Sequence, residues 1–184
     1  WGVSPDLRLK PEIAAPGGNV FSAIPNGAYE QTSGTSMATP QMAGISAIVL
    51  QRVENDPLFA SMSAREKADV VQNLIMGTAR PLTDAAQTSG ALYSPRKQGA
   101  GLVDALAATT SSVYPTVVGA PEQSRPKADL GDGTKGWHFD VTLHNLGAAP
   151  TTYELSSQAL SEIVDGGFFT GHSADWRGKG VDIA

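Results

Sequence analysis

The stretch Ser33-Gly-Thr-Ser-Met-Ala-Thr-Pro-Gln-Met-Ala-Gly44 organises the interpretation of this chain. Gly34 has the backbone freedom that a tight turn into a helix often needs. Pro40 suits a first helical turn, where a residue without an N–H donor is tolerated. Residues 42–50 are apolar or small on every side, which predicts a helix buried inside a domain.

Ser36 stands just ahead of the helical run, so its hydroxyl would lie at a helix N-terminus. There the free N–H groups and the positive end of the helix dipole favour negative charge. An acyl-transfer nucleophile needs such surroundings, because backbone donors can hold the oxyanion of its tetrahedral intermediate. The simpler alternative is that Ser36 only caps the helix, since serine is among the commonest N-cap residues.

The serine motif also resembles a known one. Gly34-Thr-Ser-Met-Ala38, followed by Pro40 and Ala43-Gly44, resembles the nucleophile motif of the subtilisin-like serine peptidases. It lacks the closing glycine of a Gly-x-Ser-x-Gly nucleophile elbow, which argues against an α/β-hydrolase esterase. Lys10-Pro-Glu-Ile-Ala-Ala-Pro-Gly17 resembles the Lys-Pro-Asp-Ile-x-Ala-Pro-Gly segment that precedes this loop in the family, with Glu12 in place of the commoner aspartate.

A third stretch, Gln98-Gly-Ala-Gly-Leu-Val-Asp-Ala-Leu-Ala-Ala108, resembles the segment that closes subtilisin-like catalytic domains. A phosphate cradle is the alternative for Gly-x-Gly before a helix, but Asp104 stands where the full pattern needs its third glycine. We therefore expect no nucleotide site. The resemblance implies an α/β fold in which residues 1–112 are the C-terminal portion of a parallel-sheet peptidase domain.

Local signals predict the elements around the serine. The prolines within Leu9–Gly18 keep that segment irregular or at a sheet edge. Residues Asn19–Ile24 and Tyr29–Thr32 predict two strands joined by a turn at Pro25-Asn26-Gly27. Ser63-Ala-Arg-Glu66 is a capping box, so Glu66 is interpreted as structural and not as a catalytic acid. The helix that it opens is predicted to end near Gly77 and to carry one apolar face, formed by Val70, Val71, Leu74 and Ile75.

Residues 113–184 differ in composition and predict strands. Val113–Val118 is one, and Trp137–His144 alternates strictly. Its apolar face is formed by Trp137, Phe139, Val141 and Leu143. Asn145-Leu-Gly147 turns the chain and Thr151–Leu155 returns it. This pattern resembles the start of the fibronectin type III-like β-sandwich that follows the catalytic domain in large cell-envelope members of the family, so we expect an incomplete sandwich.

The resemblance implies a site built around Ser36. The serine would form the acyl-enzyme and donate its own N–H to the oxyanion, while Gly34 and Thr35 shape the loop. In this family the aspartate and histidine precede the serine, and an asparagine usually completes the oxyanion hole. No histidine precedes Ser36, and the one aspartate before it, Asp6, is too near to be that triad member. We therefore expect a fragment, starting at Trp1, that lacks these upstream partners and is inactive alone.

The three histidines, His138, His144 and His172, all follow the serine. His138 and His144 share one side of a predicted strand, but lie roughly 20 Å apart, which is too far to bind one metal ion. We interpret them as solvated surface residues. A lipase-like esterase would need a histidine beside Ser36, whereas these fall in the second domain. The sequence predicts neither a metal nor a cofactor.

Composition narrows the remaining possibilities. A formal net charge of −5 and 41% hydrophobic residues are typical of a globular protein. No Lys/Arg cluster is dense enough to predict nucleic acid binding. The apolar run 42–50 is too short to span a bilayer. Cysteine is absent, which excludes a disulfide framework.

The resemblance finally implies a bacterial serine endopeptidase, secreted or attached to the cell wall, whose partners are protein or peptide substrates. The alternative from another class is a catalytically inert adhesion or spacer module. Apolar surface left by missing strands could also make the isolated piece self-associate.

Overall fold

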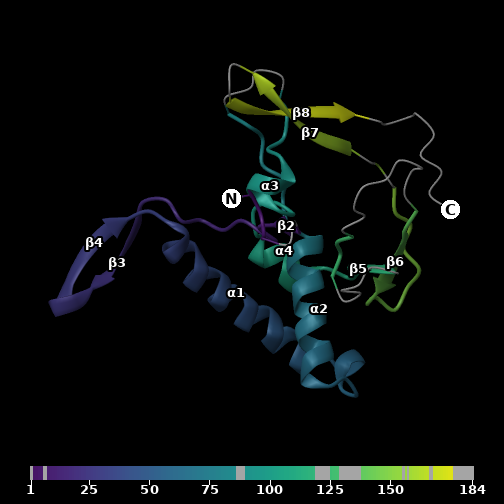
Figure 1. Ribbon diagram of the computed structural model, residues 1–184. Helices are drawn as coiled ribbons and strands as arrows, with labels where there is room; N and C mark the ends of the chain where they lie inside the picture. Colours follow the sequence, from purple (N-terminus) through teal and green to yellow (C-terminus); the bar gives the residue numbers. More distant parts are fainter. Residues whose placement is uncertain are drawn as a thin grey trace.

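The structure, a computed structural model, describes residues 2–5, 8–85, 90–118, 125–128, 138–154, 156, 158–165 and 168–175. Figure 1 shows two long helices, α1 and α2, that approach each other at one end, and a hairpin, β3–β4, that projects away from them. The elements in chain order are β1 (Gly2–Val3), β2 (Leu9–Lys10), β3 (Val20–Ile24), η1 (Pro25–Gly27), β4 (Ala28–Thr32), α1 (Thr35–Asn55), η2 (Pro57–Phe59), α2 (Ala64–Gly77), α3 (Pro95–Gln98), α4 (Ala105–Thr110), β5 (Val113–Val118), β6 (Asp140–Asn145), β7 (Gln158–Asp165) and β8 (Phe168–Asp175).

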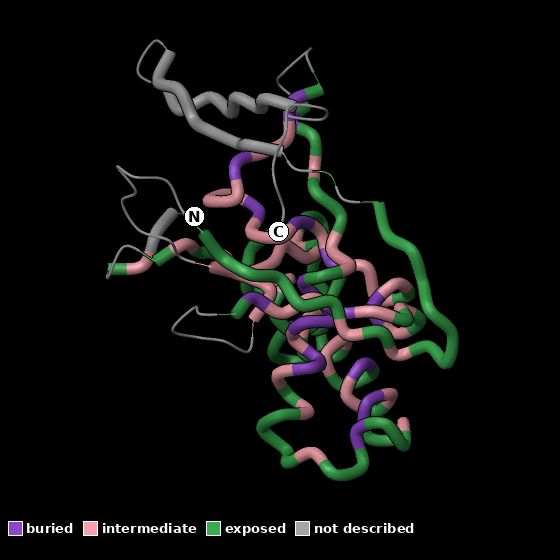
Figure 2. Tube along the Cα trace, turned by 90° about the vertical axis from the view of Figure 1, so that its right-hand side faces the viewer, coloured by how far each residue is buried: buried purple, intermediate pink, exposed green. Residues whose placement is uncertain are grey.

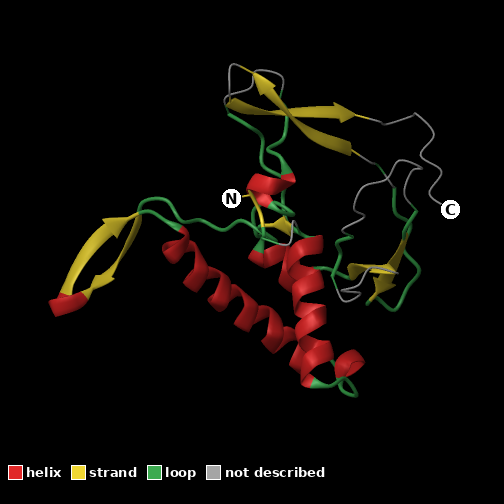
Figure 3. Cartoon of the chain, in the orientation of Figure 1, coloured by secondary structure: helices red, strands yellow, loops and turns green. Residues whose placement is uncertain are grey.

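The fold mixes helices and strands, as Figure 3 shows. The described strands pair as four two-stranded antiparallel sheets, β1–β2, β3–β4, β5–β6 and β7–β8. The expected parallel sheet is represented among the described residues by one parallel bridge, between Ala14 and Leu102. Pro11 and Pro16 flank Ala14, and because proline cannot donate to a strand ladder, the segment is irregular, as predicted.

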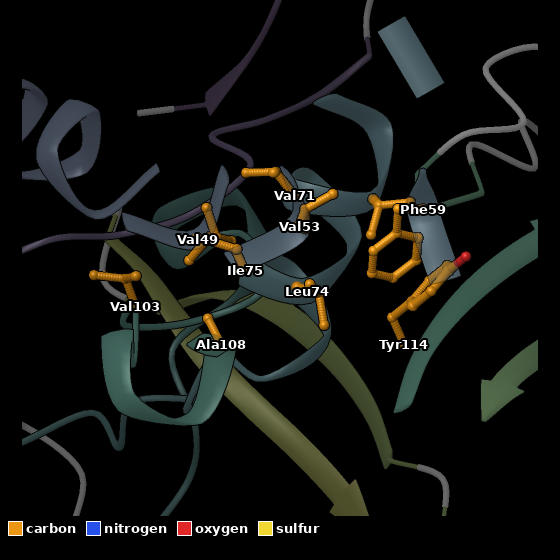
Figure 4. Packing of buried hydrophobic residues seen from close by; sticks show 10 residues of the cluster. Val49, Val53, Phe59, Val71, Leu74, Ile75, Val103, Ala108 and Tyr114 are labelled. Carbon is orange, nitrogen blue, oxygen red and sulfur yellow. The ribbon is translucent and has the colours of Figure 1, made fainter. Parts of the chain in front are cut away.

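The hydrophobic core lies where α1 packs against α2, with α4 and β5 beside them (Figure 4). The predicted apolar face of α2 is confirmed, because all four of its residues are buried. The core consists of Val49, Val53, Phe59, Val70, Val71, Leu74, Ile75, Val103, Ala108 and Tyr114. Arg52 ties α1 to α4, because its guanidinium donates to the carbonyl oxygens of Ala108, at 2.9 Å, and of Ser111.

The start of α2 matches its prediction. Ser63 is the N-cap, and its hydroxyl accepts a hydrogen bond from the Glu66 N–H at 3.3 Å. The Glu66 carboxylate accepts in return from the Ser63 backbone at 2.7 Å. The hydrogen bonds from the hydroxyl and backbone of Ser63 lower the pKa of Glu66. Glu66 is therefore a structural residue.

Helix α1 buries only one of its faces. Val49 and Val53 are fully buried, whereas Gly44 and Ala47 are exposed and Ile48 keeps 55% of its surface accessible. Figure 2 shows buried and exposed stretches that succeed each other along the chain. The prediction of a helix buried on every side is therefore wrong for the described chain, because no described element covers the outer face.

Two helical glycines provide a matched test of this packing. A Cβ at Gly44 would meet no atom within 4 Å, whereas one at Gly77 would lie 2.6 Å from Cδ of Pro115 in β5. Glycine in a helix interior costs roughly 0.5–1 kcal/mol relative to alanine, so we expect Gly44→Ala to stabilise the chain by about that amount. Gly77→Ala is expected to destabilise it by about 1–3 kcal/mol through overpacking. Thermal unfolding measures both, and shifts of the same sign would contradict the packing described.

The strand predicted at Val113–Val118 is confirmed as β5, whereas the one predicted at Trp137–His144 is observed as β6 over Asp140–Asn145. β6 pairs with β5, in a register that sets Val113 opposite Asn145. The predicted return strand at Thr151–Leu155 is wrong, since residues 151–154 form no strand. β6 pairs along one edge with β5, a partner that sequence periodicity could not reveal. Leu155 and Trp137 lie outside the described residues.

The turn that follows β6 is confirmed. The Asn145 side-chain oxygen accepts a hydrogen bond from the Gly147 N–H at 2.8 Å, and its amide donates to the Ala149 carbonyl at 2.8 Å. Among the described strands, β7 and β8 pair only with each other. The predicted β-sandwich is therefore not confirmed, because the described strands of this region form two separate sheets.

Candidate active site

Ser36 is the second residue of α1 and is exposed to solvent. The N-cap is Gly34, whose carbonyl accepts the first helical hydrogen bonds, from Met37 at 3.1 Å and Ala38 at 3.3 Å. No side chain caps the helix, so the alternative that Ser36 serves only as a cap is wrong. The backbone N–H groups of Thr35 and Ser36 precede the first helical donor, as expected at a helix N-terminus.

The loop before Ser36 rests on the second motif. The Gly34 N–H donates to the Gly17 carbonyl at 2.8 Å. A Cβ at Gly17 would lie 2.6 Å from the Gly34 oxygen and 3.1 Å from Cβ of Ala38, so only glycine fits here. Gln41, on the first turns of α1, donates to the Pro16 carbonyl at 2.8 Å. Two motifs separated in sequence therefore lie against each other, and neither Gly17 nor Gln41 was identified as a site residue from the sequence.

Gly17→Ala is expected to push the serine loop away from its support. The added methyl group would meet the Gly34 carbonyl and Ala38, so we expect a destabilisation of about 1–3 kcal/mol, as for overpacking. Gly18→Ala is the matched control, because a Cβ there would meet no atom within 4 Å. Thermal unfolding of the two variants provides the comparison. Equal losses would show that close packing at Gly17 is not the cause.

The third motif holds the other side of the same segment. We refer to residues 8–18 as the arm. The Ala14 N–H donates to the Gly101 carbonyl at 2.8 Å, and the Val103 N–H donates to the Ala14 carbonyl at 2.9 Å. The Ala100 N–H donates to Glu12 at 2.9 Å. The arm is thus fixed between the segment around residues 99–103 and the serine loop.

The hairpin that leads to the serine was predicted and is confirmed. β3 and β4 pair from Val20↔Thr32 to Ile24↔Ala28 around η1. The Ser33 hydroxyl, next to the site, accepts from the Asn19 N–H at 2.8 Å and closes the base of the hairpin. Further out, the rings of Phe21 and Tyr29 stack with centroids 5.6 Å apart, and both residues stay more than half exposed.

The combination of a helix-terminal serine, a glycine-backed loop and an adjoining hairpin corresponds to a known family. The sequence pattern described as "Subtilase family" matches residues 2–101. This chain belongs to the subtilase family. The match includes the serine loop, the arm and the first residues of the third motif.

Individual relatives of this subtilase chain carry peptidase or proteinase names. The C5a peptidase of Streptococcus pyogenes is 32% identical over 169 residues, which cover 92% of this chain and 14% of that protein. The PII-type and PI-type proteinases of Lactococcus lactis subsp. cremoris are each 36% identical over 171 residues, or 89% of this chain and 9% of those proteins. The chain thus spans a small part of the length of these relatives.

The described histidine side chains of the subtilase chain contact residues other than Ser36. His144 is half-buried in β6, where its ring stacks on Tyr114 with centroids 4.5 Å apart and Nε2 lies 2.8 Å from the Thr116 hydroxyl. The expectation of a solvated histidine is wrong there, because the β5–β6 pairing that covers it was not predicted. Burial raises the pKa of Tyr114. His138 is exposed, as predicted, with Asp140 at 3.4 Å. The side chain of His172 lies outside the described residues.

Other features of the described residues are separate from the serine. A cavity of about 500 Å³ lies between α1 and α2, but Ser36 is not among its lining residues, which include Met42, Leu50, Val71 and Ile75. Within the described ranges, His, Asp and Glu residues form no group of three that could hold a metal ion. None of the described helices has the length and hydropathy needed to cross a membrane.

Proposed function

We propose that this chain is part of a subtilase serine endopeptidase in which Ser36 is the nucleophile. The observation that carries the proposal is the position of Ser36, exposed on the first turn of α1 inside the family's serine motif. Its Oγ attacks the peptide carbonyl and forms an acyl-enzyme. The N–H of Ser36 donates to the oxyanion, and the helix N-terminus stabilises that charge. Gly34 and Thr35 shape the loop.

The remaining catalytic groups come from residues outside these 184. A histidine must accept the Ser36 proton and return it to the leaving amine, an aspartate must orient that histidine, and an asparagine completes the oxyanion hole. His138 and His144 have other neighbours, Asp140 and Tyr114. Without a base the serine is a weak nucleophile, so the chain by itself is inactive.

The substrates are proteins or peptides, and the enzyme is bacterial and secreted or held at the cell surface. The names and organisms of the relatives support this class, and they do not favour an inert spacer or adhesion module. Residues 1–112 form the C-terminal part of the peptidase domain, and residues 113–184 form a fibronectin type III-like segment. The antiparallel β5–β6 pairing supports the assignment of the second segment. The exposed outer face of α1 supports self-association of the isolated chain.

Labelling with a fluorophosphonate tests the proposal, because this reagent reacts with activated serines. We compare the 184-residue chain with the same chain extended by the upstream sequence of its peptidase, called below the extended protein. Labelling is expected only in the extended protein. An unlabelled extended protein would leave Ser36 without a catalytic role.

A further inference from the structure

Glu12 is the position where this chain departs from the aspartate of the second motif, and its carboxylate is surrounded by cations. Oε1 lies 2.6 Å from the Lys10 ammonium and 2.9 Å from the Arg125 guanidinium. Oε2 lies 3.5 Å from the Lys127 ammonium and receives no hydrogen bond from the described residues. The side chains of Glu12 and Lys127 are only 19% and 12% exposed. Because they are partly desolvated, these charges interact more strongly than a surface ion pair.

Residues 125–128 therefore dock on the arm, although they are distant from it in sequence. Besides its contact with Glu12, the Lys127 ammonium donates to the Leu9 carbonyl at 2.6 Å. Partial burial by itself raises the pKa of Glu12. The hydrogen bond from Lys10 and the charges of Lys127, Lys10 and Arg125 outweigh that effect, so its pKa lies below the ordinary value. Glu12 is thus held as a carboxylate among the three cations.

The position of Glu12 is transmitted to the serine loop through the arm. The Glu12 carbonyl accepts from Ala100, and five residues later Gly17 accepts from Gly34. Between these two contacts the arm contains one proline, Pro16, and a single-residue parallel bridge at Ala14, so no regular ladder fixes it. Its location therefore depends on a few contacts, those at Glu12 and Gly17 and the two hydrogen bonds at Ala14 between them.

We propose that Glu12 is a positioning residue, which with Arg125 and Lys127 clamps the later part of the chain onto the arm and so fixes the loop that carries Ser36. This inference rests on the proposed function for its consequence in catalysis. The clamp itself belongs to the 184-residue chain and can be tested there.

The first test measures amide hydrogen exchange in the 184-residue chain. In Glu12→Gln and Lys127→Met we expect the Gly34 and Ala100 amides to exchange about tenfold faster, because the hydrogen bonds that protect both amides open more often. Glu12→Asp should give a smaller change, because it keeps the charge but shortens the reach. Glu54→Gln, an exposed acid on α1, is the control and should change neither amide. The effect of Glu12→Gln should shrink in about 1 M salt, where ion pairs are screened.

The second test separates positioning from general stability. In the extended protein, Glu12→Gln is expected to lower kcat for a peptide substrate about tenfold with little change in KM, since the displaced groups act in the transition state. Glu12→Asp should recover part of that loss. If Gly34 exchange is unchanged in Glu12→Gln and Lys127→Met, the clamp is refuted. If the Gly34 amide exchanges faster but kcat is unchanged, the clamp has a structural role only, and Glu12 is not a positioning residue for catalysis. A wild-type extended protein that is inactive would refute the proposed function alone.

Discussion

Ser36→Ala in the extended protein is expected to abolish labelling by a fluorophosphonate and to lower kcat for peptide hydrolysis by a factor on the order of 10⁶, as in serine peptidases that lose their nucleophile. The substitution removes one oxygen atom from an exposed residue whose side chain does not cap α1. We therefore expect the free energy of unfolding to change by less than about 0.5 kcal/mol, as for surface substitutions away from special features. Activity and stability should thus respond very differently to the same change.

Ser46→Ala is the control for this experiment. Ser46 lies on the same helix, where it lines the cavity between α1 and α2, and has no part in the proposed mechanism. It should label as the wild type does. If Ser36→Ala is still labelled at the wild-type rate, another serine is the nucleophile. Labelling of the unextended 184-residue chain would contradict the claim that it lacks a working base.

The parts of this structure that could be predicted are those specified by neighbouring residues. The capping box at Ser63 and Glu66 and the turn at Pro25–Gly27 each need only a few consecutive side chains and backbone conformations. The serine loop belongs to the same class in part, because Gly34 is the N-cap of α1. The expectation that Pro40 lies in the first turn is wrong, since it is the sixth residue of the helix. Local signals of this kind do not depend on which distant segments of the chain pack against them.

The parts that could not be predicted depend on which distant segments meet. Alternation predicted a strand at Trp137–His144, and β6 is observed at Asp140–Asn145, but alternation does not name the partner, which is β5 and not residues 151–154. The prediction that His144 is solvated was wrong for the same reason, since its ring stacks on Tyr114 of β5. Likewise, the contact of Glu12 with Arg125 and Lys127 has no local signature.

Gly99 shows how a glycine can be recognised in sequence while its role stays hidden. The sequence placed it in a glycine-rich turn before a helix. In the structure its φ is +61°, and a Cβ would lie 2.3 Å from the carbonyl carbon of Glu12 and 2.6 Å from the oxygen of Pro11. Gly99 therefore serves two needs, a left-handed backbone and close passage of the arm. A side chain at this position should therefore strain the backbone and also clash with the arm.

Gly99→Ala is accordingly expected to destabilise the chain by about 2–5 kcal/mol, where about 1–2 kcal/mol comes from the left-handed conformation and the rest from overpacking against the arm. Gly90→Ala isolates the first contribution, because Gly90 has a φ of +70° and open space where its Cβ would be. Urea unfolding of both variants at an unchanged slope measures the difference.

If the two variants lose the same stability, the arm does not press on Gly99, and the close contact with Glu12 is wrong. If Gly99→Ala loses more, its effect should also reach the serine loop. The arm accepts hydrogen bonds from Ala100 at the Glu12 carbonyl and from Gly34 at the Gly17 carbonyl, so a shift at the first contact displaces the second. Faster amide exchange of Gly34 in Gly99→Ala, but not in Gly90→Ala, is the result expected if the third motif supports Ser36 from a distance.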